Sequence, residues 1–137
     1  MGIDISCTKC NFQDKQCYIY KRELLDALRE YLKKNKNQHP LELKYINYFY
    51  RYEKDDKERI LHMEDKEKKE AIKLLEENEL DGLFVWINLG QEDYISVYDA
   101  RRFLRAYDKV KEFMKDGFMD YCILEHAEEN NHPLQCW

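Results

Sequence analysis

The amino-terminal segment is the part of the chain best equipped for chemistry, because it holds three of the five cysteines. Cys7, Cys10 and Cys17 all lie within the first seventeen residues. Two residues separate Cys7 from Cys10, which is the spacing of one half of a tetrahedral zinc site built from thiolates and imidazoles. Such a site needs four ligands, so the rest of the chain must supply the other half.

A second half of a zinc site lies near the end of the chain. Cys122 and His126 are four residues apart and would share one face of a helix. Cys7, Cys10, Cys122 and His126 are therefore the candidate ligands of a zinc site, which is the alternative interpretation of these residues. The further candidate ligands are Cys17, His39, His132 and Cys136. Because the two halves lie far apart in the chain, the favoured interpretation is that reduced thiols pack as small hydrophobic side chains.

Other cysteine chemistry fits the sequence less well. The amino-terminal residues lack the basic lead and apolar run of a secretory signal. We therefore predict a cytoplasmic protein in a reducing compartment, where structural disulfides are not expected. Thioredoxin-type chemistry needs a Cys-x-x-Cys at the start of a helix, whereas here the helical pattern begins only near Gln16.

Sequence motifs of common catalytic sites are absent from the chain. It has no glycine-rich phosphate loop, no Gly-x-Ser-x-Gly and no His-Glu-x-x-His, and it contains only four glycines. This favours a non-catalytic protein and leaves enzymatic activity as an open question. Gln91, Glu92 and Asp93 follow an apolar segment, at the kind of position where open sheets bind ligands. The alternative is an acidic loop that leads into a helix.

A tyrosine-rich stretch, YINYFYRY, covers residues 45–52. Tyrosine and arginine are frequent anchors of protein interfaces. We therefore predict an interaction surface at Tyr48, Tyr50, Arg51 and Tyr52, with a protein partner or a second copy of the chain. The favoured interpretation of the stretch is a helix face that packs in the core with one exposed tyrosine edge, and a platform for single-stranded nucleic acid is the alternative. The net charge of -5 disfavours nucleic acid, which requires positive charge.

Length and composition indicate one globular domain over residues 1–137. The chain is 44% hydrophobic and 14% aromatic, which is sufficient for a packed core. No stretch reaches the roughly 18 apolar residues that cross a bilayer, so no membrane association is expected. The abundance of lysine, asparagine and tyrosine suggests an AT-rich genome, such as that of a protist, a low-GC bacterium or a large virus.

Hydrophobic periodicity predicts the elements that position these residues. The helical pattern covers 16–34, 40–52, 71–78, 97–115 and 118–129. Strands are predicted at 2–6, 83–89 and 133–137, and the uninterrupted apolar run 83–89 is expected at the centre of the sheet. We predict an α/β or α+β fold, helix-rich, with about five helices around a small sheet of about three strands. Ser96 is expected to cap the helix at 97–115, with Asp99 three residues further on.

The predicted core and function follow from this arrangement. The expected core residues are Leu24, Leu28, Tyr45, Phe49, Phe84, Val85, Ile87, Phe103, Leu104 and Tyr107. The sequence favours a small intracellular interaction or regulatory module without catalytic activity. The alternative is a zinc-stabilised or small-ligand-binding domain that uses the Cys-x-x-Cys or the loop after the central strand.

Overall fold

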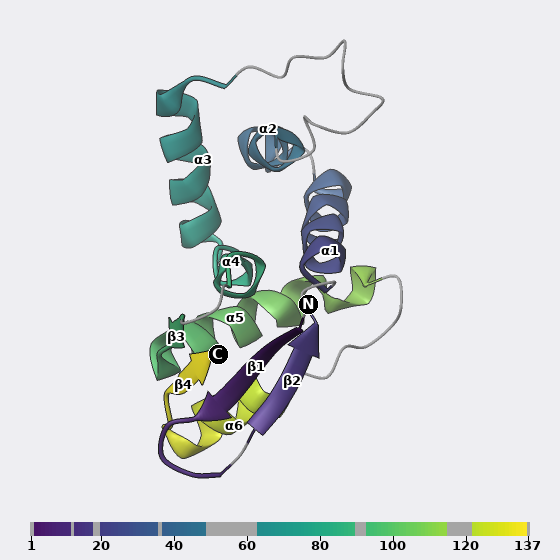
Figure 1. Ribbon diagram of the computed structural model, residues 1–137. Coiled ribbons are helices and arrows are strands. Elements are labelled where there is room, and N and C mark those ends of the chain that lie inside the picture. The colour runs from purple at the N-terminus through teal and green to yellow at the C-terminus, as the bar shows by residue number, and fades with distance from the viewer. Residues whose placement is uncertain are drawn as a thin grey trace.

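The protein is a helix-rich α+β fold, which confirms the predicted fold class. The computed structural model describes residues 2–11, 13–17, 20–35, 37–48, 63–89, 93–114 and 122–136. Figure 1 shows a small sheet at one end, helix α5 across the middle, and helices α1 to α4 at the other end. The elements are β1 (Gly2–Cys7), β2 (Gln13–Cys17), α1 (Tyr20–Lys34), α2 (Pro40–Tyr48), α3 (Asp65–Glu77), α4 (Leu83–Ile87), β3 (Tyr94–Ile95), α5 (Val97–Val110), a 3-10 helix (Lys111–Phe113), α6 (Cys122–Asn130) and β4 (Leu134–Cys136).

The sheet joins segments from both ends of the sequence. Its strand order is β2-β1-β4-β3, and every neighbouring pair is antiparallel. The predicted strands at 2–6 and 133–137 are confirmed as β1 and β4, which pair with each other. The two edge strands were not predicted, since β2 (QDKQC) lacks an apolar alternation and β3 is only two residues long. Strand β2 also explains why α1 begins at Tyr20 rather than at residue 16.

The predicted central strand at 83–89 is wrong, because residues Leu83–Ile87 form helix α4. Backbone bonds of helical type run from Asn88 N to Phe84 O (2.9 Å). Leu83 and Trp86, three residues apart, are buried, whereas Phe84, Val85 and Ile87 are partly exposed. An uninterrupted apolar run has no period, so it fits a short buried helix as well as a strand.

Helix α4 packs closely against α5 at Gly82, the residue that precedes α4. A Cβ atom placed on Gly82 would lie 2.1 Å from the carbonyl oxygen of Arg102 in α5. Only glycine therefore fits this contact. An ion pair between Asp81 and Arg102 holds the same two segments together.

A continuous hydrophobic core extends from the helices to the sheet. The ring of Phe103 in α5 lies 6.0 Å from that of Trp86 and is stacked on that of Tyr107 at 5.8 Å. Ile5 of β1 and Leu134 of β4 belong to the same core. Among the predicted core residues, Leu24, Leu28, Phe103 and Tyr107 are buried, Tyr45, Phe84, Val85, Ile87 and Leu104 are partly buried, and Phe49 lies outside the described residues.

Where the structure describes them, the predicted helices agree in type, apart from Gln16 and Cys17 in β2, and differ at their ends; residues 49–52 and 118–121 lie outside the described residues. The side chain of Ser96 accepts a hydrogen bond from the Asp99 amide (3.0 Å), which confirms the predicted cap of α5. Helix α2 begins at Pro40 as predicted, and α3 starts earlier than expected, at Asp65. Just before α2, His39 is buried and its Nδ1 contacts the buried carboxylate of Glu42.

Candidate metal centre

The pairing of β1 with β4 determines where the Cys-x-x-Cys lies. Cys7, the last residue of β1, is opposite Leu134, the first residue of β4. The chain after β1 stays beside the chain before β4, because Thr8 donates to the carbonyl oxygen of Pro133 from its amide (3.1 Å) and its hydroxyl (2.9 Å). This register therefore brings Cys7 next to His132.

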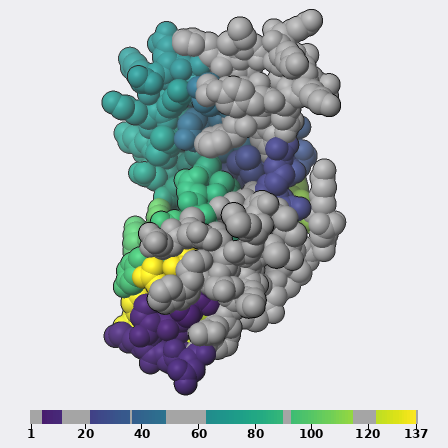
Figure 2. All heavy atoms as spheres, viewed as in Figure 1, coloured from purple at the N-terminus to yellow at the C-terminus, as the bar shows by residue number. Residues whose placement is uncertain are grey.

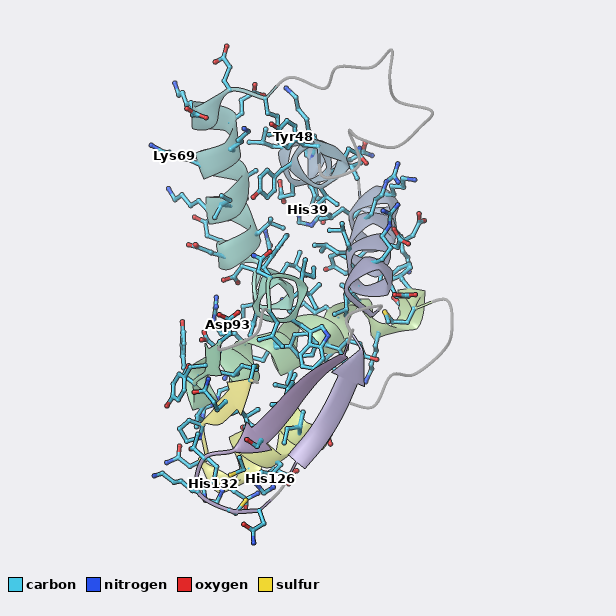
Figure 3. All side chains as sticks on the ribbon, in the orientation of Figure 1. His39, Tyr48, Lys69, Asp93, His126 and His132 are labelled. Carbon is cyan, nitrogen blue, oxygen red and sulfur yellow. The ribbon has the colours of Figure 1, made fainter. Side chains whose placement is uncertain are left out.

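A left-handed residue after α6 brings His132 back beside His126. Asn131 follows α6 with φ 58°, and the amide of His132 donates to the carbonyl oxygen of Ala127 (3.1 Å). Many helices end with such a bond, in which an amide donates to the carbonyl oxygen five residues earlier. Asparagine is one of the residues that adopt the left-handed conformation at this position. The two imidazole rings lie 5.6 Å apart (Figure 3).

Two sulfur atoms and two imidazole nitrogens meet at this point. Cys7 Sγ lies 3.3 Å from His132 Nδ1, and Cys10 Sγ lies 3.1 Å from His126 Nε2. One ligand atom from each of the four residues lies within 4.8 Å of all the others. Bonds of about 2.0–2.3 Å to zinc would place tetrahedral ligands roughly 3.3–3.8 Å apart. Small shifts of the side chains, some inward and some outward, would bring the four atoms to these separations.

The surroundings of Cys7 favour its thiolate form. Burial of this side chain, which is 6% exposed, raises the pKa of the thiol. Hydrogen bonds from the Cys10 side chain and from the amides of Lys9 and Cys10, together with the Lys9 charge, outweigh burial and leave the pKa below its usual value. The Lys9 amide lies 3.4 Å from Cys7 Sγ. Because thiolates are the metal-binding form of cysteine, this environment suits a ligand.

Asn130 occupies the far side of the His126 ring. Its Nδ2 donates to the His126 carbonyl oxygen (3.0 Å) and lies 3.3 Å from His126 Nδ1. The other ring nitrogen, Nε2, faces Cys10. In metal-binding histidines the second ring nitrogen carries a proton and donates to an acceptor, so the Asn130 NH₂ group near Nδ1 is not the outer partner of a zinc ligand.

The cluster agrees with the predicted ligand set at three positions and adds a fourth residue. Cys7, Cys10 and His126 were predicted, whereas His132 was only a further candidate. Cys122 is the first residue of α6, and its side chain lies outside the described residues. A signal for His132 exists in the sequence, because it follows the helix stop Asn130-Asn131, where the chain turns back.

The other further candidates lie apart from the cluster or cannot be placed. The side chain of Cys136 is buried in the core, and His39 contacts Glu42 beside α2, at the opposite end of the molecule. Cys17 belongs to β2, but its side chain is outside the described residues. Figure 2 shows the amino-terminal residues (purple) at the surface of the lower end, beside carboxyl-terminal residues (yellow).

Of the four predicted interaction residues the structure describes only Tyr48, which lies at the opposite end of the molecule from the candidate metal centre (Figure 3). Tyr48 is partly buried against α3, where Lys68 lies 4.5 Å from its ring centroid, and Tyr50, Arg51 and Tyr52 lie outside the described residues. Of the described large apolar or aromatic side chains, the most exposed are Tyr98 (66%) and Tyr94 (57%).

The acidic loop predicted at 91–93 is described only at its last residue. Gln91 and Glu92 are outside the described residues, and Asp93 is exposed, with its carbonyl oxygen accepting from the Cys136 amide (2.8 Å). The loop follows helix α4 rather than a strand, so the sheet-edge argument for a ligand site is wrong. A separate hollow of about 390 Å³ is lined by Tyr98, Arg102 and Arg105 of α5 together with Glu76, Glu79 and Asp81.

Comparison of this chain with protein-family models, with curated proteins and with solved structures found no match. Among the described helices, none is both long and apolar enough to cross a bilayer. The site must therefore be judged by its geometry, in which four ligand atoms of the types that zinc prefers converge from two distant segments.

Proposed function

We propose that the chain is a small zinc-stabilised module, in which Cys7, Cys10, His126 and His132 bind one zinc ion. The observation that carries this proposal is the convergence of their four ligand atoms within 4.8 Å. Two thiolates balance the charge of Zn²⁺ and two neutral imidazoles complete the shell, so the centre is neutral overall. Mixed sulfur and nitrogen ligands in a tetrahedral arrangement favour zinc over magnesium or calcium, which prefer oxygen.

The zinc has a structural role in this proposal. Catalytic zinc sites keep one position for water or substrate, whereas four protein ligands fill a tetrahedral shell. The ion would connect the loop after β1 with the turn between α6 and β4. The thiolate ligands must remain reduced, which is consistent with the predicted cytoplasmic location.

The test is a metal analysis of purified protein with matched ligand variants. We expect one equivalent of zinc by mass spectrometry, and the spectrum of tetrahedral thiolate coordination after replacement with cobalt. His132→Asn should lower the zinc affinity by at least about tenfold, because one of four bonds is lost. Cys122→Ser is the matched control and should bind zinc as the parent does.

Two results would contradict this assignment. A chain that binds no zinc under reducing conditions would refute the zinc-stabilised module. Loss of zinc in Cys122→Ser with full binding in His132→Asn would instead support the ligand set predicted from the sequence.

A second candidate function is the binding of a protein partner through exposed tyrosines, without catalysis. It is supported by the exposure of Tyr94 (57%) and Tyr98 (66%), since tyrosines are frequent interface anchors. A Tyr94→Ala/Tyr98→Ala variant should remain folded and lose self-association or partner capture in a pull-down from host cells. Unchanged association would contradict a role for this surface.

A further inference from the structure

We propose that the metal centre is a redox-sensitive clamp, in which a hydroperoxide converts Cys7 and Cys10 to a disulfide and releases the zinc. This inference rests on the proposed zinc site and adds its regulation. Cys7 ends β1 and Cys10 lies in the loop that follows, and their Sγ atoms lie within 4.8 Å of each other.

The two cysteines differ in access to solvent, which sets the order of the reaction. Cys10 is exposed, so a small oxidant in solution reaches its sulfur, whereas Cys7 is 6% exposed. Oxidation by peroxide follows the exposure and thiolate character of a cysteine, and it is reversible where a second cysteine lies close by. Both sulfurs are thiolates in the proposed zinc centre, so exposure decides the order: Cys10 is the site of attack and Cys7 the resolving residue.

The electrons balance in two steps. The Cys10 thiolate attacks one oxygen of hydrogen peroxide, the O–O bond breaks, and a sulfenic acid and hydroxide form. The Cys7 thiolate then attacks the Cys10 sulfur, which forms the S–S bond and expels a second hydroxide. The two sulfurs lose two electrons in total, and peroxide gains them. A dithiol reverses the process by thiol–disulfide exchange.

The disulfide would remove the zinc cross-link between the two segments and would not substitute for it. It links the end of β1 to the loop that follows it, so it forms no connection between that loop and α6 or β4. Zinc would be left with the imidazoles of His126 and His132 as its only remaining ligands from the cluster. Oxidation therefore removes the cross-link between the two segments but leaves the hydrogen bonds between β1 and β4.

The experiment uses the zinc-loaded full chain and hydrogen peroxide as the probe. Zinc release is followed with a colorimetric chelator, and the disulfide is mapped by alkylation, non-reducing digestion and mass spectrometry. We expect one zinc released for each Cys7–Cys10 disulfide, and full recovery after dithiothreitol and zinc are added. Cys136→Ala, which removes a buried cysteine outside the cluster, should behave like the parent.

The outcomes separate this inference from the proposed function. If the untreated chain holds zinc but peroxide neither releases it nor forms the disulfide, the zinc site stands and the clamp is refuted. Release accompanied by sulfinic acid at Cys10 without a disulfide also refutes the clamp. If the untreated chain holds no zinc, both proposals fail. A Cys10→Ser variant provides a second check, because it should form no intramolecular disulfide at Cys7.

Discussion

In the proposed zinc-bound protein, the two ends of the molecule share one hydrophobic core but differ in what else holds them. At the helical end, α1, α4 and α5 bury side chains such as Leu28, Trp86 and Phe103 almost completely. At the sheet end, β3 and β4 have two and three residues, and four ligand side chains meet near the surface. Apolar burial tolerates substitutions that keep size and shape, whereas metal binding requires particular atoms at particular places. The two ends should therefore respond to different perturbations.

Removal of zinc should have the largest effect, and it should act at the sheet end. At free zinc of 1,000 times the dissociation constant, binding adds about 4 kcal/mol to the free energy of unfolding. This contribution should disappear with a chelator, and it should decline as pH falls because protons compete for the two sulfurs and two imidazoles. Urea denaturation with and without a chelator measures the total loss in the free energy of unfolding.

Amide hydrogen exchange shows where the effect of zinc removal lies. Protection should fall first in β1, β4 and α6, while α1 and α5 remain protected. Equal loss of protection at both ends would contradict the proposed division between them.

Replacement of Gly82 should have the next largest effect, at the helical end. In Gly82→Ala the new methyl group would meet the carbonyl oxygen of Arg102, so α4 and α5 must separate. We expect a loss of about 3 kcal/mol in the free energy of unfolding, measured by urea denaturation. The folded fraction should still bind one zinc. A stability equal to that of the parent would show that the two helices are not this close.

The buried pair of His39 and Glu42 tests whether polar contacts also support the helical end. In His39→Leu, the Glu42 carboxylate would remain buried without its imidazole partner. We expect a loss of about 2 kcal/mol in thermal or urea denaturation. The double variant His39→Leu/Glu42→Leu should recover part of the loss, because neither polar group remains. A double variant that is less stable than His39→Leu would contradict this account.

The smallest effects concern two residues with left-handed backbone, one at each end. Glu79 (φ 56°) follows α3 and Asn131 (φ 58°) follows α6. Glu79→Gly should raise the free energy of unfolding by about 1 kcal/mol, since this conformation is costly for residues other than glycine and asparagine. Asn131→Gly should change it less. Thermal denaturation compares the two.

A matched control separates backbone strain from ion pairing at Glu79. The carboxylate of Glu79 lies 4.0 Å from Arg105 and 3.9 Å from Lys109, but it is 58% exposed, so these pairs contribute little. Glu79→Ala removes them and keeps the strain. It should be no more stable than the parent, and an equal gain in both variants would contradict the strain argument.

The sequence was sufficient for the fold class and for those elements that carry a local signal. Strand β1 alternates apolar and polar residues, and α5 has both helical spacing and the Ser96 cap. The apolar run that forms α4 lacks such a signal, because burial on several sides erases the period that distinguishes helix from strand. The decision between the two comes from tertiary contacts such as that of Gly82 with α5.

The candidate site was only partly accessible to sequence reasoning. The spacing of Cys7 and Cys10 indicates a half-site, and His126 lies on a patterned helix. The selection of His132 depends on the left-handed turn at Asn131 and on the register of β1 with β4, which are properties of the folded chain. Spacing along a helix suggests Cys122 just as readily, because it describes one element at a time.

The position of β4 has a consequence for how the chain is made. β4 lies between β1 and β3, yet its three residues are the last of the described chain to leave the ribosome. While the helices are being synthesised, the edge of β1 that pairs with β4 has no partner strand. β3 also has no strand to pair with until β4 is made. A product that stops before Leu134 would retain all the described helices. Its β1–β2 pair and its β3 strand would no longer be joined in one sheet.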